Sequence, residues 1–317
     1  VLDVTEYQTQ VTGPFGQPVL MSYYQKDEMA FFEMASLVGL GSIPAEKRNP
    51  LELETRGIGE LILQLVDQGV KTICVGIGGS ATNDGGIGMA AGLGVAFYDD
   101  QGHLLRPVGA SLGRVARIDT SAIPKALKDI ELQVLTDVTN PLCGSQGATY
   151  IFGGQKGLNP LLFPAVDQAM QDFYQLANAR ILSMAGAGAG GGMAAGLVAF
   201  AGGQISSGIE KSLDLINFDH KVQKADLVVV GEGRMDLQSL SGKAPVGVAK
   251  RTPEKIPVIA ICGSLAEDLP AFPSHHIDAA FSIVKGPCEV PDALAHAEQN
   301  LISCARNIGN LLKMKTN

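Results

Sequence analysis

The stretch TICVGIGGSATNDGG, residues 72–86, decides the fold of this chain. Its first part, Thr72 to Ile77, is a continuous apolar run, which predicts a buried strand covered on both faces, as in a parallel sheet. Glycines and short polar residues follow at once, and a helix-like segment, MAAGLG, comes next. This order of strand, glycine turn and helix is typical of open α/β sheets, which usually bind ligands at such a turn.

Three further apolar runs favour the same kind of sheet: LVVV at 227–230, VIAI at 258–261 and AFSIV at 280–284. Helical patterns with apolar residues at steps of three and four occur at Glu54–Gln68, Lys243–Lys250 and Pro291–Leu312. We therefore predict a doubly wound, flavodoxin-like (Rossmann-like) parallel sheet, which these runs share with residues 72–77.

The first of these strands lies far from the other three in the sequence, so the predicted domain is discontinuous. It would consist of residues 45–95 and 224–317, with its own first strand upstream of residue 1. Residues 1–44 and 96–223 would form an inserted mixed α/β domain. Its shorter strands are expected at Val11–Tyr24, Val95–Gln101, Leu132–Thr136 and Thr149–Phe152.

A tract of glycine, alanine, methionine and aliphatic residues at 180–203 carries no charged side chain after Arg180. Two structures account for it: a close-packed helix entered by a glycine turn, which we favour, or a loop that approaches a ligand closely. Its GAGAGG string satisfies GxGxxG. No apolar strand precedes that string, so we do not interpret it as a dinucleotide fingerprint.

Composition limits the classes of function. The chain has 317 residues, 46% of them hydrophobic and 18% charged, with no Trp and a formal charge of −8. These values indicate a well-buried globule of two domains without the basic face that a nucleic acid or an anionic membrane requires. No apolar run reaches the roughly 18 residues of a transmembrane helix. The five cysteines include no CxxC pair, which favours reduced thiols and a cytoplasmic location.

Ser80, Thr82, Asn83 and Asp84 follow the glycines of the central stretch. One interpretation is an anion site, in which backbone N–H groups and hydroxyls bind phosphate or carboxylate while Asp84 holds Mg²⁺ or a substrate hydroxyl. The other is a strand-to-helix turn whose Asn or Asp caps the next helix and binds no ligand. The residue types leave both open. No GxxxxGK[ST] string occurs, so this turn is not a Walker A loop.

A second polar string, GEGRMDLQSLSGK at 231–243, follows the LVVV run. It supplies the groups that phosphoryl transfer needs, with cations in Arg234 and Lys243 and carboxylates in Glu232 and Asp236. A surface turn stabilised by an internal Arg–Asp pair is the alternative explanation.

Polar residues also end two other predicted strands, in DVTNPL at 137–142 and FGGQKG at 152–157. Asp137, Asn140 and Lys156 stand there, although an Asn-Pro turn explains part of this pattern. The histidines are scattered, and no convincing nucleophile elbow occurs. Zinc catalysis and a hydrolase triad are therefore not expected.

Several of these strings together resemble the bacterial type I glycerate kinase family along essentially the whole chain. GIGGSATNDGG, DVTNPL, the GAGAGGGM tract, SGIE at 207–210, GEGRMDLQSLSGKAPVGVA and CGSL at 262–265 occur in the family's order and spacing. The resemblance implies ATP-dependent phosphorylation of D-glycerate, with 2-phosphoglycerate as the usual product. It also implies a two-domain α/β fold with a flavodoxin-like half and an inserted half.

The sequence departs from the family's pattern in two places. A strand followed by Pro-Asp-Ser-x-Lys, and later an Asp-Gly-Gly-Glu-Gly-Thr string, are expected upstream of Val1. Gly154 stands where the family usually has Pro in FGPQKG. The first departure bears on catalysis, because those strings hold acidic and basic residues, and the second bears on the rigidity of one loop.

We therefore expect ATP, Mg²⁺ and D-glycerate to bind between the two domains. The expected partners are these small molecules, and the sequence leaves open whether the protein forms a homodimer. It also does not distinguish the strings that bind ATP from those that bind glycerate. The expected catalytic residues are Asp84, Arg234, Asp236 and Lys243. The expected cofactor-binding residues are Gly78, Gly79, Ser80, Thr82, Asn83 and Glu232. The expected metal ligands are Asp137 and Asp236.

Two other functions stay open at this point. A dinucleotide-dependent oxidoreductase would suit the α/β pattern and the glycine content, but it requires a true GxGxxG with an acidic residue about 20 positions later, which is not found. A non-catalytic binding protein for a sugar acid would suit a sequence in which the family strings expected upstream of Val1 are missing.

Overall fold

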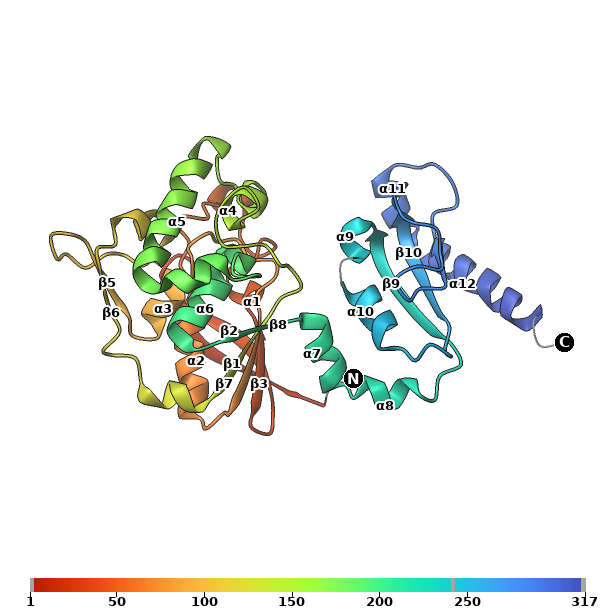
Figure 1. Cartoon of the computed structure of the whole chain (residues 1–317), viewed down its shortest axis with the longest axis horizontal. Coiled ribbons are helices and arrows are strands. Elements are labelled where there is room, and N and C mark those ends of the chain that lie inside the picture. Colours follow the sequence, from red (N-terminus) through yellow and green to blue (C-terminus); the bar gives the residue numbers. More distant parts are fainter. Residues whose placement is uncertain (1–2, 241–242, 315–317) are drawn as a thin grey trace. The chain divides into compact units, whose positions relative to one another are not determined.

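The structure is a computed structural model that describes residues 3–240 and 243–314. The chain forms two compact units, Val1–Gly208 and Ile209–Asn317 (Figure 1). The strands of the first unit are β1 Thr5–Thr12, β2 Pro18–Lys26, β3 Met29–Glu33, β4 Thr72–Gly76, β5 Ala96–Tyr98, β6 Arg117–Asp119, β7 Glu131–Leu135 and β8 Gln204–Ser206. Its helices are α1 Ala35–Val38, α2 Arg56–Asp67, α3 Ile87–Gly92, α4 Ala148–Phe152, α5 Phe163–Asn178 and α6 Met193–Ala201.

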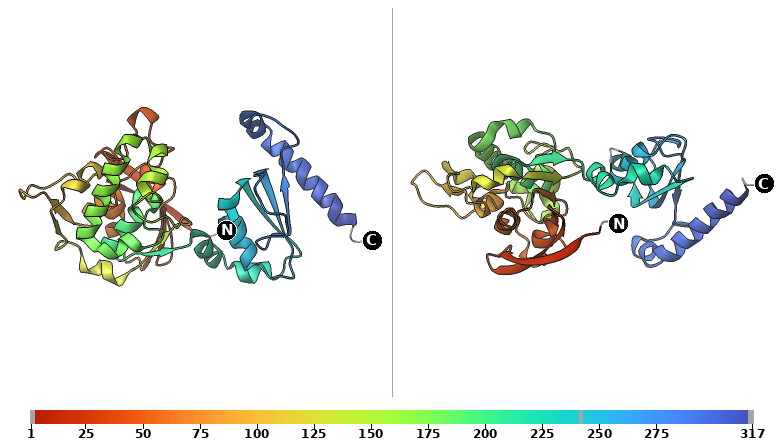
Figure 2. Two further views of the ribbon diagram at one scale, coloured as in Figure 1. Left: turned by 45° about the horizontal axis from the view of Figure 1, so that its top comes forward. Right: turned by 90° about the horizontal axis from the view of Figure 1, so that it is seen from below.

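Six strands of the first unit form one mixed sheet in the order β1-β2-β3-β4-β7-β8. β1, β2 and β3 are antiparallel neighbours, whereas β3, β4, β7 and β8 run parallel. The hairpin of β1 and β2 (red) forms one border of this unit in the right-hand view of Figure 2. Because β3, β4, β7 and β8 share one direction, their last residues meet along one border of the sheet, called here the carboxyl edge.

The core of the first unit forms between α2 and the central strands. Ile58, Leu61 and Leu65 of α2 are fully buried in one cluster with Ile73 and Val75 of β4. Burial of each such side chain contributes about 1.5–3 kcal/mol, so the apolar run and the amphipathic helix beside it stabilise each other. The strand and the helix predicted from these patterns are confirmed.

The glycine-rich tract at 180–203 forms a glycine turn and then α6, as favoured from its composition. Its glycines let the backbone approach the turn that follows β4. A Cβ built on Gly191 would overlap the carbonyl oxygen of Thr82, and one built on Gly192 would lie 2.7 Å from Cα of Gly85. The N–H of Gly85 donates to the carbonyl of Gly191 at 3.0 Å. The close approach is therefore to the chain's own backbone.

The second unit is a smaller parallel sheet with helices on both faces. Its strands, β9 Val228–Met235, β10 Val258–Leu265 and β11 Ala279–Ser282, pair in the order β11-β10-β9. α10 lies on one face of this sheet, and α11 and α12 lie on the other (Figure 2). The helices are α7 Gly208–Leu215, which begins at the last residue of the first unit, α8 Phe218–Val222, α9 Leu237–Leu240, α10 Ala244–Arg251, α11 Val290–Ala295 and α12 Ala297–Met314.

The mixed α/β class with a parallel sheet is confirmed, but the sheet topology corrects the predicted domain arrangement. β4 pairs with β3 and β7, so it does not share a sheet with β9, β10 and β11. Residues 45–95 accordingly lie in one compact unit with 1–44 and 96–207, and not with 224–317. The reason is that a continuous apolar run shows burial on both faces but carries no information about the partner strand.

One predicted strand, Thr149–Phe152, is helical in the structure. It belongs to α4, which packs against α5, and the ring of Tyr150 contacts that of Phe163 with 5.7 Å between centroids. Its β-branched and aromatic residues favour a strand locally, and tertiary packing overrides this preference. The run Val11–Tyr24 divides into β1 and β2, and the pattern at Pro291–Leu312 divides into α11 and α12.

Candidate active site

The turn after β4 has an exposed half and a buried half. Gly78 and Gly79 are exposed at the carboxyl edge, and Gly79 has φ of +67°, in the left-handed region that glycine tolerates best. Within the described part of the chain, no group accepts a hydrogen bond from the N–H of either glycine. Two neighbouring N–H groups at the end of a parallel strand are suited to binding an anion.

The buried half begins at Ser80. Ser80 is 3% exposed, and Thr82, Asn83 and Asp84 are fully buried. The amide nitrogen of the Asn83 side chain donates to Oγ1 of Thr149 at 3.0 Å. These side chains lie in the interior, so of the predicted cofactor-binding residues in this turn only Gly78 and Gly79 are open to a ligand.

Asp84 caps α3. Its carboxylate accepts from the hydroxyl of Thr55 at 2.6 Å and from the N–H groups of Gly86 and Gly88 at 3.1 and 3.4 Å. Burial raises the pKa of Asp84, and these three hydrogen bonds act in the opposite direction. A carboxylate that is fully buried and accepts three hydrogen bonds does not fit the predicted catalytic role of Asp84. It fits the alternative interpretation, in which an acidic residue binds the start of the next helix.

Lys156 lies in the short 3-10 helix that follows α4, and its side chain binds the buried half of the turn. Its Nζ is 2.9 Å from Oγ of Ser80 and 2.7 Å from the carbonyl oxygen of Thr82, and the residue is only 3% exposed. Desolvation lowers the pKa of Lys156 to about 7, although the nearby charge of Asp84 opposes this shift. The ammonium therefore holds the turn from inside, and it does not face the carboxyl edge.

Two buried oxygens of the turn stay without partners within the described residues: Oγ1 of Thr82 and Oδ1 of Asn83. Each buried acceptor that finds no donor costs about 1–3 kcal/mol. The packing around the turn thus lowers the stability of the fold locally, which is a common feature of functional sites.

Acidic residues border Gly78 and Gly79 on the carboxyl edge. Glu33 ends β3, is accessible, and pairs in register with Gly76 of β4. Asp137 follows β7 and is also exposed, and its Oδ1 accepts from the hydroxyl of Ser207 at 3.1 Å. Desolvation by its neighbours raises the pKa of Glu33.

The second polar string lies at the end of β9 in the other unit. The Oδ1 atom of Asp236 accepts from the N–H of Ser239 at 2.9 Å and lies 4.0 Å from Nζ of Lys243. The hydrogen bonds from Ser239 and the charge of Lys243 lower the pKa of Asp236. Asp236 thus caps α9, and it also accepts a backbone hydrogen bond from Gln238. Ser241, another member of the string, lies outside the described residues.

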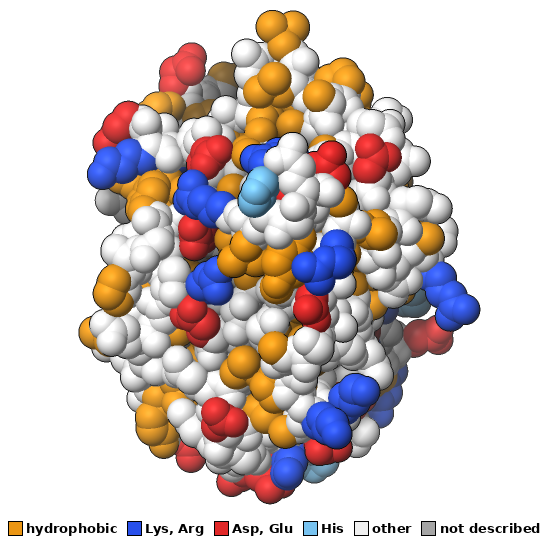
Figure 3. Space-filling view, turned by 90° about the vertical axis from the view of Figure 1, so that its left-hand side faces the viewer, with side chains coloured by type: hydrophobic (Ala, Val, Ile, Leu, Met, Phe, Trp, Pro, Cys, Tyr) orange, Lys and Arg blue, Asp and Glu red, His pale blue; other side chains and the backbone are white. Residues whose placement is uncertain are grey.

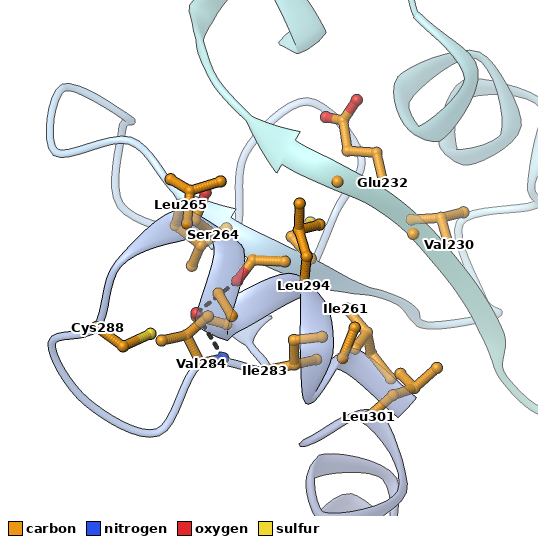
Figure 4. Close-up of a pocket in the computed structure, with 18 of the residues that line it drawn as sticks. Val230, Glu232, Ile261, Ser264, Leu265, Ile283, Val284, Cys288, Leu294 and Leu301 are labelled. Atoms are coloured by element: carbon orange, nitrogen blue, oxygen red, sulfur yellow. Dashed lines mark hydrogen bonds between the residues drawn. The ribbon is translucent and has the colours of Figure 1, made fainter. Parts of the chain in front are cut away.

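Glu232 and Arg234 alternate along β9 with residues of the opposite face. Arg234 is exposed, and Oε1 of Glu232 is buried with no partner in the described chain. A pocket of about 850 Å³ lies between β9–β11 and helices α11 and α12, and Glu232 is one of the residues at its border. Figure 4 shows the Glu232 side chain leading away from Leu294 and Ile261. The pocket is therefore mainly apolar, and the polar string does not converge in it.

The structure thus divides the predicted site residues into three sets, and the first is the buried group of Ser80, Thr82, Asn83 and Asp84. Gly78 and Gly79 lie at the carboxyl edge with Asp137, and the second unit holds Glu232, Arg234, Asp236 and Lys243. The sequence reasoning missed Glu33, and the available signal was a charged residue that ends the apolar run MAFF.

Mg²⁺ usually takes one or two protein carboxylates and completes its shell with water and substrate phosphates. Within residues 3–240 and 243–314, no group of three or more His, Cys, Asp or Glu residues is placed to hold a metal ion. Single carboxylates are present, because Asp137 is exposed beside the Ser207 hydroxyl and Asp236 is partly exposed at the start of α9. This donor set fits an ion that arrives with a phosphate ligand.

Basic, acidic and hydrophobic side chains are mixed over short distances on the face of the first unit that Figure 3 shows. None of the helices described by the structure has the length and apolar character needed to cross a membrane.

Comparison with known proteins identifies the family. The sequence profile of the glycerate kinase family matches residues 1–313. A glycerate kinase of Neisseria meningitidis serogroup B is 56% identical over 313 residues, which are 99% of this chain and 84% of that protein. The glycerate 2-kinase of Escherichia coli K12 is 41% identical over 314 residues, 97% of this chain and 82% of that protein.

A solved structure agrees with these matches. The crystal structure of a Salmonella typhimurium LT2 protein assigned as glycerate kinase 2 has a TM-score of 0.81 and 40% sequence identity, over 98% of this chain and 83% of that one. The family resemblance and the enzyme class expected from the sequence are confirmed, and the chain belongs to the glycerate kinase family.

Proposed function

We propose that this chain transfers the γ-phosphoryl group of ATP to the C2 hydroxyl of D-glycerate, with Mg²⁺ bound to the nucleotide. Membership of the glycerate kinase family supports phosphorylation of glycerate. The name of the Escherichia coli relative, glycerate 2-kinase, supports 2-phosphoglycerate as the product. Neither the oxidoreductase nor the binding-protein alternative gains support from these matches.

The observation that carries the proposal in the structure is the exposed glycine turn at the carboxyl edge. Gly78 and Gly79 present N–H groups that no described residue uses, Glu33 ends the neighbouring strand β3, and Asp137 follows the neighbouring strand β7. We assign an anionic group of the reactants to these N–H groups, because uncommitted amides in a left-handed glycine turn bind carboxylate or phosphate oxygens. Asp137 would hold the Mg²⁺ through its carboxylate, and the ion would screen the phosphate charges.

The second unit would contribute charge complementary to the phosphates of ATP. Arg234 is exposed at the end of β9, and the ammonium of Lys243 follows α9. Phosphoryl transfer spreads negative charge over the equatorial oxygens, and fixed cations stabilise that charge. Asp236 would keep Lys243 in place through their ion pair, and its partly exposed carboxylate would accept a hydrogen bond from the nucleotide or coordinate Mg²⁺.

The proposal also includes a cytoplasmic location, because none of the five cysteines, all of which lie in the described part of the chain, is paired in a disulfide.

A product-identified kinase assay tests the proposed function. The purified full-length protein is incubated with D-glycerate and MgATP, and ³¹P NMR follows the new phosphate ester. An ester at C2 has one vicinal proton and gives a doublet, whereas an ester at C3 gives a triplet. A doublet that requires both ATP and Mg²⁺ is expected. A triplet would contradict the assigned hydroxyl, and the absence of any ester would contradict the function.

Lys243→Met tests the role of the second unit in the same assay. We expect kcat/KM for ATP to fall by about 100-fold, because one fixed cation near the phosphates is lost. Lys250→Met is the matched control, since Lys250 is an exposed lysine in the last turn of α10 and should leave the rate unchanged. Equal rates for the two variants would refute the assignment of Lys243.

A further inference from the structure

The position of Glu33 on the carboxyl edge carries an inference beyond the assignments made above. Glu33 is the last residue of β3 and lies opposite Gly76, which is the last residue of β4. A Cβ built on Gly76 would overlap all three atoms of the Glu33 carboxyl group. The carboxylate therefore occupies the space that a side chain at position 76 would take, and it lies across the end of β4.

This placement brings the carboxylate next to the exposed glycine turn. Gly78 follows Gly76 by two residues, and the N–H of Met34, the residue after Glu33, donates to the carbonyl of Gly76 at 2.7 Å. β3 and β4 are thus paired up to their last residues, so the position of Glu33 relative to the start of the turn is fixed. The first glycine of GIGG makes room for the carboxylate, and the next two supply the N–H groups.

Glu33 is also chemically uncommitted. The described residues supply no hydrogen bond and no ion pair to its carboxylate, and the residue is accessible. Asp84, only a few residues further along β4 and its turn, is by contrast fully buried and bound by three donors. An accessible, unpaired carboxylate beside unpaired N–H groups is the arrangement that a proton acceptor for a bound hydroxyl needs.

We propose that Glu33 is the general base of the reaction and accepts the proton of the glycerate hydroxyl that attacks ATP. This inference rests on the proposed function. As the hydroxyl oxygen forms its bond to the γ-phosphorus, its proton moves to the Glu33 carboxylate. The bond from the γ-phosphorus to the β,γ-bridging oxygen breaks, and ADP leaves with that electron pair. Glu33 then releases the proton to solvent.

The titration of Glu33 fits this role. A general base acts in its ionised form, so the rate should fall as the pH drops through the pKa of the base. Desolvation raises the pKa of Glu33, which shifts this acid limb toward higher pH and makes the carboxylate a stronger proton acceptor. The titratable groups on the strands beside it and in the segments that follow them are Tyr23, Tyr24 and Lys26 on β2, Cys74 on β4, Asp84 in the turn after β4, Glu131 on β7 and Asp137 after β7.

Glu33→Gln is the decisive variant, because it preserves shape and removes the ability to accept a proton. In the full-length protein we expect kcat to fall by at least about 100-fold, with KM for glycerate and for ATP changed by less than about threefold. The acid limb of the kcat–pH profile should disappear. Glu33→Asp keeps a carboxylate that is one methylene shorter, so it should show an intermediate kcat and retain the acid limb.

Glu28→Gln is the matched control, since Glu28 is an exposed glutamate just before the start of β3. It should leave kcat and the pH profile unchanged, and circular dichroism should show the same melting temperature for all three variants. If Glu33→Gln keeps more than about a third of the wild-type kcat, or keeps the acid limb, Glu33 only shapes the turn and the inference is wrong. If the wild-type protein forms no phosphoglycerate, the proposed function is wrong, and the role of Glu33 that rests on it is wrong as well.

Discussion

The buried ammonium of Lys156 should make the stability of the first unit rise with pH. In the folded state its pKa is about 7, whereas the unfolded chain holds the proton up to the usual lysine value of 10.5. Between these two values the unfolded state binds more protons, so the free energy of unfolding increases as the pH rises. Integration of this difference from about pH 7 to about pH 9 gives a gain of about 2 kcal/mol.

The assay is urea unfolding followed by circular dichroism at several values between pH 7 and 9, since the chain has no Trp for fluorescence. In Lys156→Met the gain should vanish, because the titrating group is gone. At about pH 9 this variant should also be less stable than the wild type by about 1–3 kcal/mol, since Ser80 and Thr82 lose a hydrogen-bond donor. Lys128→Met, an exposed lysine of the same unit, should keep the wild-type pH dependence. A flat wild-type profile, or the same rise in Lys156→Met, would refute the reasoning.

Two further predictions concern packing around the turn. Gly191→Ala should destabilise the first unit by more than about 3 kcal/mol in the same unfolding assay, because its Cβ would overlap the Thr82 carbonyl at a φ of +72°. Gly202→Ala has a similar φ of +69° but open space, so it should cost only about 1 kcal/mol, and equal costs would contradict the steric argument. Asp84→Asn should lower stability by about 2–4 kcal/mol, because its amide cannot accept all the bonds from Thr55, Gly86 and Gly88. An unchanged melting temperature would show that the cap is dispensable.

The sequence predicted the elements well because burial leaves a local signal. The run at 72–77 and the pattern at 54–68 became β4 and α2, since a strand covered on both faces and an amphipathic helix each have a characteristic period. The local sequence carries no comparable signal for which strands pair with each other. The runs at 72–77 and 258–261 are equally apolar, yet they belong to different sheets. The assignment of β4 to the sheet of β9–β11 failed for that reason.

The chemistry of the site was harder to predict than the elements. Ser80 and Asp84 are polar residues in a turn, and that pattern is the same for a ligand site and for an internal hydrogen-bond network. Only burial and bond partners separate the two. Glu33 attracted no notice in the sequence, because its importance depends on a contact with Gly76 across two strands that are far apart in the chain.

The buried half of the turn holds the exposed half in the fixed conformation that the proposed anion site requires. Glycines have the largest conformational freedom in an unfolded or loose segment, so N–H groups carried by Gly78 and Gly79 would lose entropy on binding unless they were held beforehand. They are held on both sides. β4 fixes the chain before them, and Ser80 is fixed after them by Lys156, while the N–H of Leu40 donates to the Gly79 carbonyl at 2.9 Å. Donors fixed in advance cost no reorganisation when charge develops, and this preorganisation is the main contribution of a protein to phosphoryl transfer. Ser80, which sequence reasoning assigned to the ligand, would therefore act on the proposed ligand through the backbone that it immobilises.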